Sequence, residues 1–231
     1  MGVPGATSPP AAAVADALVR FGLEVRLAPP AIRRVTPGPI VIGPAVPCRH
    51  AGSVDVFLEA VESADPGGVL VIDNEGRQDE ACIGDLTAIE VAGAGLAGIV
   101  VWGLHRDTAE IRAIGVPVWS LGSIPFGPRS SRPRRADRLA SATIGDVEIT
   151  RDDIVVADDD GVVFVSAIRL DEVLGEASRI AAAERGQAEL VAAGTSLRQQ
   201  FDFATYLERR RQDESYDLRR HLSERGAAIE T

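Results

Sequence analysis

The sequence predicts one α/β domain built on a parallel sheet, followed by a long helix and a charged helical arm. Three observations support this fold class. Apolar runs alternate with helical patterns between residues 54 and 121, and strands joined by helical crossovers pair in parallel. The 231 residues are 45% hydrophobic, which is enough for one sizeable core. A stripe of apolar residues at three- and four-residue steps then runs through residues 168–193, as in an amphipathic helix.

The N-terminal third begins the alternation. Residues 1–10 are rich in Gly, Pro and Ser and are expected to be flexible. The elements expected after them are a helix at 11–21, a strand at 39–47, a helix at 54–61 and a buried strand at 68–73. Because Gly and Pro interrupt regular structure, the Gly43-Pro44 pair is expected to break the first of these strands.

The remainder continues the alternation and then changes character. The expected elements are helices at 86–94 and 107–114 and strands at 98–102, 116–121, 142–147 and 162–165. Residues 123–137 contain too many Pro, Gly and Ser residues for regular structure and predict a long loop. Gly194 is expected to end the long helix. We therefore divide the chain into a flexible segment 1–10, a catalytic domain 11–194 and a helical arm 195–231.

Composition excludes several kinds of function. The formal net charge of −10 disfavours general binding of nucleic acid, because phosphate backbones would be repelled. The chain contains no lysine, which excludes a lysine Schiff base and a P-loop. Two isolated cysteines indicate neither a disulfide framework nor structural zinc. No signal peptide or long apolar segment is recognisable, so we expect no membrane association and a cytoplasmic location.

Two short motifs twenty residues apart carry the main functional signal: Gly84-Asp85 and Arg106-Asp107. Each acid has an ordinary explanation as a helix cap, with Asp85 capping a helix that begins at Leu86 and Asp107 forming a capping box with Glu110. Considered together, both acids precede helices that follow parallel strands. Such helices begin at the same edge of the sheet, where open α/β sheets bind their ligands.

The residue types at this edge suit a metal ion and an anionic substrate. Two carboxylates with open space beside them are typical ligands of Mg²⁺ or Mn²⁺, which usually keep several waters. The amides of Leu86 and Thr87, at the start of a helix, are suited to an oxyanion. Arg106 adds a cationic fork for the same anion.

With these motifs the chain resembles the RraA-like family, which includes the class II 4-hydroxy-4-methyl-2-oxoglutarate/4-carboxy-4-hydroxy-2-oxoadipate aldolases. The resemblance rests on an Asp, twenty intervening residues and Arg-Asp, and on three supporting segments: IGPAV, PGGVLVID and ADDDGVVFV. It extends over residues 14–197. It implies a swivelling β/β/α domain and a homotrimer or homohexamer with sites between subunits.

The resemblance also implies roles for individual residues. Asp107 would chiefly hold a divalent cation, and Asp85 would hold a metal-bound water. Arg106, together with the segment that contains Gly84, Leu86 and Thr87, would bind the pyruvoyl group and its enolate. In similar enzymes the C-terminal helix of an adjacent subunit contributes a glutamate to the site. The matching residue is Glu184, whose other interpretation is a surface carboxylate at the edge of the apolar stripe.

Four further features have alternative interpretations. His105 replaces the small or aliphatic residue usual before the Arg-Asp pair, and is either an acid/base catalyst or a residue that shapes the pocket. The GxGxxG letters at 93–98 follow a predicted helix and precede a strand, the reverse of a dinucleotide site. Residues 158–161 are interpreted as a turn rather than a calcium site. A cluster of arginines is either a solvated loop or a site that recruits a polycarboxylate: Arg129, Arg132, Arg134, Arg135 and Arg138.

The sequence thus predicts a metal-dependent lyase that cleaves a 4-hydroxy-2-oxo acid to pyruvate, with oxaloacetate decarboxylation as a possible side reaction. The expected partners are a 2-oxo acid substrate and further copies of the chain. The alternative is a non-catalytic regulatory protein, because some RraA-like proteins regulate an RNA-degrading endonuclease. A methyltransferase, a label sometimes attached to the family, lacks support from any glycine-rich loop between a strand and a helix.

Overall fold

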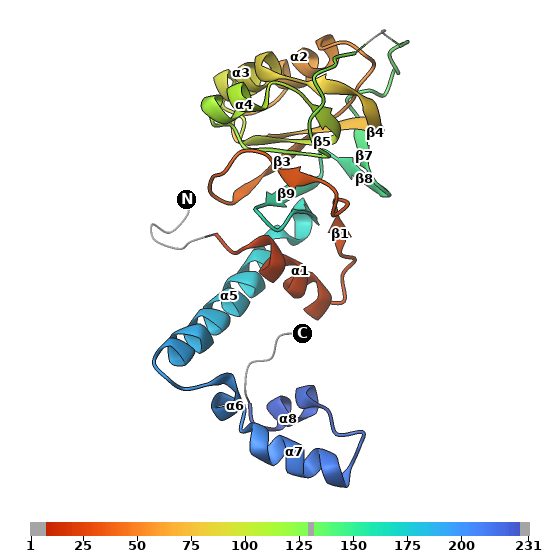
Figure 1. The fold of residues 1–231 in the computed structure, drawn as a ribbon. Helices are drawn as coiled ribbons and strands as arrows, with labels where there is room; N and C mark the ends of the chain where they lie inside the picture. The colour runs from red at the N-terminus through yellow and green to blue at the C-terminus, as the bar shows by residue number, and fades with distance from the viewer. Residues whose placement is uncertain (1–7, 129–131, 227–231) are drawn as a thin grey trace.

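The computed structural model describes residues 8–128 and 132–226. Most of the predicted flexible segment 1–10, the last residues of the arm and Arg129 of the arginine cluster lie outside these ranges. Within the described ranges the chain folds into a mixed α/β domain with a large sheet, which confirms the predicted fold class (Figure 1). No helix in these ranges combines the length and the apolar character that crossing a membrane requires.

One sheet of eight strands organises the described part of the domain. In spatial order its strands are β1 (Arg26–Leu27), β10 (Val162–Ser166), β9 (Asp153–Ala157), β3 (Val41–Arg49), β4 (Val69–Ile83), β5 (Gly98–His105), β6 (Val118–Ser120) and β2 (Arg33–Arg34). The central strands β3 to β6 pair in parallel, as their helical connections predict. The outer strands on both sides pair antiparallel.

Strand β3 is continuous, so the predicted break at Gly43-Pro44 is wrong. Residues 41–44 pair antiparallel with β9, and residues 45–49 pair in parallel with β4. The proline, which has no N–H to donate, therefore stands where the strand exchanges one partner for the other. Gly43 is required by a close approach, because a Cβ there would lie 2.1 Å from the carbonyl oxygen of Gly67.

Strand β4 is much longer than the predicted segment 68–73. It continues to Ile83 through register shifts against β5, which are the signature of β-bulges. The predicted strand 142–147 is instead a hairpin of β7 (Ser141–Ile144) and β8 (Val147–Thr150). Gly145 turns the chain there with φ +62°. The predicted turn at 158–161 is confirmed between β9 and β10.

Helices cover the sheet in two groups (Figure 1). The first group comprises α2 (Asp55–Glu62), α3 (Asp85–Gly93) and α4 (Thr108–Ile114), which share one apolar core with β3, β4 and β5. The second comprises α1 (Ala11–Arg20) and α5 (Leu170–Ala192), which pack on each other and on β9 and β10. A short 3₁₀ turn, Ala167–Arg169, leads into α5. The first group is the one that positions the predicted site.

The C-terminal arm is a small cluster of three helices at the far end of α5 (Figure 1): α6 (Leu197–Gln200), α7 (Phe203–Gln212) and α8 (Leu218–Glu224). Gly194, with φ +97°, separates them from α5, as expected. Aromatic contacts among Tyr206, Tyr216 and His221 hold the cluster together. All the buried side chains of α5 lie at or before Ala181, so the distal half of the helix is largely exposed.

Candidate active site

The two predicted motifs meet at the carboxyl edge of the parallel strands. Strand β4 leads into α3 through Gly84, and the neighbouring strand β5 leads into α4 through Arg106. Ile83 and His105, the last residues of the two strands, are paired in register. The backbone N–H of Arg106 donates to the carbonyl oxygen of Ile83 at 3.0 Å. The structure thus brings together the two motifs, which are separated by twenty intervening residues, as the sequence predicts.

Gly84 allows the two motifs to touch. A Cβ at this position would lie 2.5 Å from Oδ2 of Asp107 and 3.3 Å from Nε of Arg106. Real Cβ atoms essentially never approach another atom to within 3.0 Å. Only glycine therefore allows the Asp107 carboxylate to lie against this turn.

Asp107 occupies an unusual backbone conformation. Its φ of 58° and ψ of 44° place it in the left-handed region, which costs energy for any residue with a side chain. It precedes α4 as predicted, but its side chain makes no cap hydrogen bond among the described residues, so the predicted capping box with Glu110 is wrong. Its Oδ2 instead lies 3.5 Å from the backbone nitrogen of Asp85 and 3.3 Å from Nε of Arg106. The strained backbone directs the carboxylate toward the site.

Asp85 is the first residue of α3, and Gly84 is the N-cap; the predicted capping role of Asp85 is therefore wrong. The Asp85 Oδ1 accepts a hydrogen bond from the N–H of Leu86 at 2.8 Å. A carboxylate in the first turn is stabilised by the helix dipole. Of the two predicted amide donors, that of Leu86 is therefore engaged by Asp85, and an anionic ligand would take the place of this carboxylate oxygen. The Thr87 side chain is buried.

Arg106 lies beside a cleft of about 250 Å³. The cleft is lined by Arg106, Asp107, Thr108, Ser123, Ile124 and Pro125. About half of the Arg106 side chain is exposed. A Cβ at Gly127 would lie 2.9 Å from Nη1 of Arg106, so the backbone of the loop after β6 lies against the guanidinium. The arrangement holds a cation where a small anion can reach it.

The loop that lines this cleft is the part of the site that sequence reasoning missed. Residues 123–137 are predicted only as a long loop, yet residues 123–125 form one wall of the cleft and the backbone at Gly127 lies against the arginine. The signal in the sequence is positional: a segment rich in Pro and Gly directly follows a parallel strand at the edge where ligands bind.

His105 is buried beneath the site. Its Nδ1 lies 2.7 Å from Oγ of Ser120, and its Nε2 lies 2.9 Å from Oγ1 of Thr108. Burial is the main cause that lowers the pKa of this imidazole. Both ring nitrogens are thus occupied by hydroxyl groups, which is the setting of a residue that shapes the pocket. Its predicted role as an acid/base catalyst gains no support from this geometry.

Glu184 is half-buried in α5. In Figure 1 that helix runs away from α3 and α4 toward the arm. The structure therefore does not bring Glu184 to Asp107 within one chain. Its predicted role at the site depends on a second copy of the chain.

The oxygen donors at the cleft suit a small hard cation. Across residues 8–128 and 132–226, no group of three or more His, Cys, Asp or Glu side chains is arranged to hold a metal ion. Asp107 lines the cleft, and the backbone nitrogen of the half-buried Asp85 lies 3.5 Å from its Oδ2, so two carboxylates stand on neighbouring turns. Mg²⁺ is usually bound in proteins through one or two carboxylates while it keeps several waters. This donor set fits such an ion.

Comparisons with known proteins agree with this architecture. Protein DlpA of Legionella pneumophila is 31% identical over 196 residues, which cover 81% of this chain. The chain spans 31% of the length of that relative. The structure of RraAS2 from Streptomyces coelicolor, described as an unusual member of the RNase ES inhibitor RraA protein family, is 30% identical, with a TM-score of 0.64. The match covers 80% of this chain and 91% of that one.

An uncharacterized protein from Pseudomonas syringae pv. tomato has the same fold. Its TM-score is 0.72 at 24% identity, over 83% of this chain and 92% of that chain. The model of the RraA-like family, described as Aldolase/RraA, matches residues 11–164. The chain therefore belongs to the RraA-like family, which includes both aldolase-type lyases and inhibitors of RNase E.

Proposed function

We propose that the chain is a divalent-metal-dependent lyase that cleaves a 4-hydroxy-2-oxo acid and releases pyruvate. The observation that supports this proposal is that Arg106 and Asp107 line one cleft while the Asp107 side chain reaches the start of α3 at Asp85. The Asp107 carboxylate lies 3.5 Å from the Asp85 amide nitrogen and 3.3 Å from the Arg106 guanidinium. A purely structural cap would not require the left-handed conformation of Asp107 or the glycine that accommodates its side chain.

In this proposal Arg106 binds the carboxylate end of the substrate. A guanidinium forms paired hydrogen bonds with a carboxylate, and its exposed position at the cleft allows a small acid to reach it. When the bond between C3 and C4 breaks, the electron pair moves into the pyruvoyl group and forms an enolate. The positive charge of Arg106 stabilises this developing negative charge, which is the kind of interaction that lowers a barrier most.

Asp85 carries the proton in the same scheme. The 4-hydroxyl group loses its proton as C4 becomes a carbonyl, and the enolate gains a proton at C3 to give pyruvate. Asp85 stands half-buried at the start of α3, with its backbone nitrogen 3.5 Å from the Asp107 carboxylate, and in this scheme its carboxylate takes and returns the proton directly or through an ordered water. The same enolate chemistry accounts for oxaloacetate decarboxylation as a side reaction.

Asp107, together with Asp85, would hold the Mg²⁺ or Mn²⁺ ion, which when bound supplies a Lewis acid for the enolate oxygen. The composition supports a metal-dependent aldolase, because a chain with no lysine cannot use a lysine imine to accept the electron pair of the broken C–C bond. His105 does not touch the reacting atoms in this scheme. It positions α4, because its Nε2 is bonded to Thr108 at the start of that helix.

A pyruvate-release assay tests the proposal. Purified chain should convert a 4-hydroxy-2-oxo acid to pyruvate with Mg²⁺ or Mn²⁺, and it should lose activity in EDTA and regain it when the ion is restored. Arg106→Gln should lower the rate by about 10²- to 10³-fold, the cost of one enolate-stabilising group. Arg169→Gln, which removes only a surface ion pair with Glu172, is the matched control. Full activity after rigorous chelation would refute the metal-dependent mechanism.

The family also offers a non-catalytic alternative, a regulator of an RNA-degrading endonuclease. It is favoured by the 30% identity with RraAS2, whose description names an inhibitor family. An Asp107→Ala variant distinguishes the two functions. In a regulator, Asp107→Ala should leave inhibition of the endonuclease unchanged, and no 2-oxo acid should be turned over by the unmodified chain.

We further infer that the active assembly is a homotrimer or homohexamer in which Glu184 of one copy completes the site of another. Two features support the inference. Among the described residues no three metal-ligating side chains come together, and Glu184 lies in the largely exposed distal half of a helix that projects from the domain (Figure 1).

A further inference from the structure

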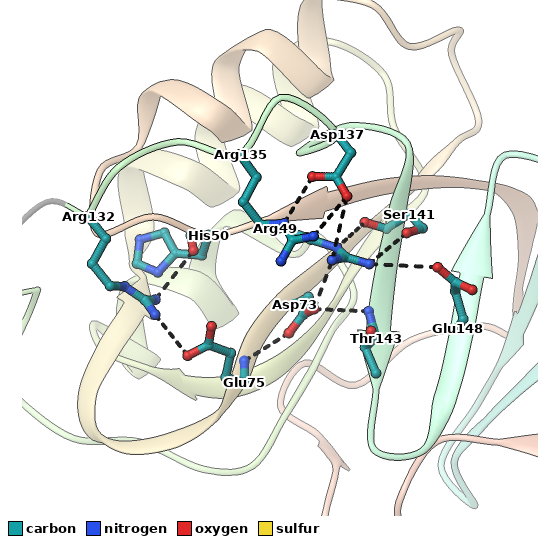
Figure 2. Close-up of polar contacts among 10 residues, drawn as sticks. All are labelled: Arg49, His50, Asp73, Glu75, Arg132, Arg135, Asp137, Ser141, Thr143 and Glu148. Carbon is teal, nitrogen blue, oxygen red and sulfur yellow. Dashed lines mark hydrogen bonds and ion pairs between the residues drawn. The ribbon is translucent and has the colours of Figure 1, made fainter.

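A second pocket lies at the carboxyl end of β3 and beside residues 73–75 within β4 (Figure 2), and it shares no lining residue with the cleft of Arg106. Its volume is about 160 Å³, the space of about five water molecules at ~30 Å³ each. Three arginines, a histidine and two acids supply its polar lining: Arg49, Arg132, Arg135, His50, Asp73 and Glu75. The room suits a small acid and excludes a nucleotide.

The structure divides the arginine cluster of the sequence into two parts. Arg134 forms ion pairs with Asp55 and Glu59 of α2, and Arg138 also pairs with Glu59. These two arginines fasten the loop to the domain. Arg132 and Arg135 instead line the pocket, where they join Arg49 from the end of β3.

Arg49 is a fixed member of the pocket. Its Nε donates to the carbonyl oxygen of Ser141 at 3.1 Å, and its Nη2 donates to Oγ of the same residue at 2.8 Å. Three carboxylates lie farther from it, at 3.7 to 4.0 Å: Asp73, Asp137 and Glu148. Asp73 is itself satisfied, because its oxygens accept hydrogen bonds from the amides of Glu75 and Thr143. The guanidinium is therefore held by its hydrogen bonds to Ser141, within salt-bridge distance of these three carboxylates.

The other two arginines form ion pairs with exposed acids, and Nη2 of Arg132 also donates to the carbonyl oxygen of His50 at 3.3 Å. Arg132 contacts Glu75 at 2.8 Å, and Arg135 contacts Asp137 at 2.9 Å. The Glu75 and Asp137 side chains are 64% and 48% exposed. Because exposed ion pairs contribute little, an incoming anion can replace these carboxylates, which return to water at small cost.

Two buried polar atoms in the pocket residues lack a hydrogen-bond partner among the described residues: Nε2 of His50 and Nε of Arg132. His50 is 6% exposed, and its ring stacks on Phe57. Its Nδ1 is bonded to Oδ1 of Asn74 at 2.8 Å, which leaves Nε2 as the free end of the imidazole. Unsatisfied buried polar atoms are uncommon in folded proteins and indicate a missing partner.

From this geometry we propose that the pocket is a second binding site that takes a small hydroxycarboxylate. The carboxylate oxygens accept from Arg49, Arg132 and Arg135, and a hydroxyl group meets His50 Nε2. A hydroxyl both donates and accepts a hydrogen bond, so it satisfies the imidazole in either tautomer. In Figure 2 His50 and Arg132 lie on one side and Arg49 on the other, which suits an acid with polar groups along its length. The site does not depend on the chemistry proposed for the cleft.

Calorimetric titration of the full chain with L-malate and with succinate tests this site, because the two acids differ by one hydroxyl group. Malate should bind saturably and about fivefold more tightly than succinate, as expected for one additional hydrogen bond. Arg132→Gln should weaken malate at least about tenfold, the loss expected for a charge-assisted bond. His50→Phe, which keeps a ring on Phe57 and has no hydrogen-bonding atom, should remove the preference for malate over succinate.

Two control variants locate the binding. Arg134→Gln, in the same loop but paired with α2, should bind malate as the unmodified chain does. Arg106→Gln, which removes the cation of the cleft, should keep the saturable malate binding that Arg132→Gln weakens. Circular dichroism checks that each variant is folded. If the variant of the buried His50 is unfolded, the loss of malate affinity in the Arg132 variant tests the proposed site. Absence of saturable binding, equal affinity for the two acids, or a loss in Arg106→Gln without a loss in Arg132→Gln would overturn the proposal.

Discussion

Gly84→Ala is the sharpest perturbation of the proposed site, because it adds a single methyl group at the point where the two motifs touch. The φ of Gly84 is −148°, which alanine also adopts without strain. The effect is therefore local and steric. The added Cβ would lie 2.5 Å from Asp107 Oδ2, whereas contacts shorter than 3.0 Å essentially never occur. The Asp107 carboxylate must retreat by at least about 0.5 Å, and by nearly 1 Å to reach ordinary van der Waals contact.

The expected loss of activity follows from the displacement of the Asp107 carboxylate. A misplacement of about 1 Å at a catalytic site costs up to about 10²-fold in rate, so Gly84→Ala should lower kcat/KM for pyruvate release by roughly 10- to 100-fold. Stability should change little, because the Asp107 side chain is only partly buried and can move toward solvent. We expect a loss below about 1.5 kcal/mol, typical of mild overpacking, which lowers Tm by no more than roughly 6 °C in a chain of this size.

Steady-state pyruvate release and a thermal melt, measured on the same preparation, provide the assay. Gly93→Ala is the matched control, because Gly93 lies in the same helix and a Cβ there meets nothing within 4 Å. This control should retain full activity and Tm. If Gly84→Ala keeps the unmodified rate, the Asp107 carboxylate is not part of the chemistry. A rate loss that merely follows unfolding would refute the local steric explanation.

Two further predictions concern the buried histidine and the assembly. Burial lowers the pKa of His105 in the folded state from its ordinary value of 6.5. The contribution of the neutral imidazole to the free energy of unfolding is therefore fully present above about pH 6.5, and it is lost as pH falls through the lowered pKa of the folded state. The loss is at most about 1.4 kcal/mol per pH unit. Burial also lowers the pKa of His50, so this residue adds to the same pH dependence. When unfolding by urea is measured between about pH 7.5 and 5, the free energy of unfolding of His105→Gln should depend less steeply on pH than that of the unmodified chain. An unchanged slope would contradict the lowered pKa of His105. For the assembly, oligomers mixed from Asp107→Ala and Glu184→Ala subunits should recover part of the activity that each variant lacks alone, and verified mixed oligomers without recovery would exclude a shared site.

Local patterns predicted the parallel centre of the fold well, but they could not predict pairing between distant segments. The helices after Gly84 and Arg106 begin within one residue of their predicted positions, because each is bounded by strong signals in its own sequence. The exchange of partners along β3 depends instead on β9, more than a hundred residues later. The bulged continuation of β4 likewise follows from its pairing with β5, which leaves no simple period in the sequence.

In the candidate site, too, local sequence signals were predictive and contacts between distant segments were not. Spacing along the chain placed Asp85, Arg106 and Asp107 at one sheet edge, because the direction of parallel strands fixes where each helix begins. The left-handed backbone of Asp107 and the loop wall near Gly127 were not predictable, since both depend on contacts between segments. The caps that seemed the ordinary explanation are absent from both acids within the described chain. The Asp107 carboxylate instead contacts Arg106 and the backbone nitrogen of Asp85, and the Asp85 carboxylate accepts from the amide of Leu86.

The central claim is that Asp107 takes part in the cleavage of a 4-hydroxy-2-oxo acid. Its most direct test is the rate of pyruvate release with Mg²⁺ for the unmodified chain and for Asp107→Asn, which keeps the shape of the side chain and removes its charge. Asp146→Asn, at the exposed turn between β7 and β8, is the control. We predict a loss of at least about 10²-fold for Asp107→Asn and none for the control. Equal rates for the unmodified chain and Asp107→Asn would contradict the proposed mechanism.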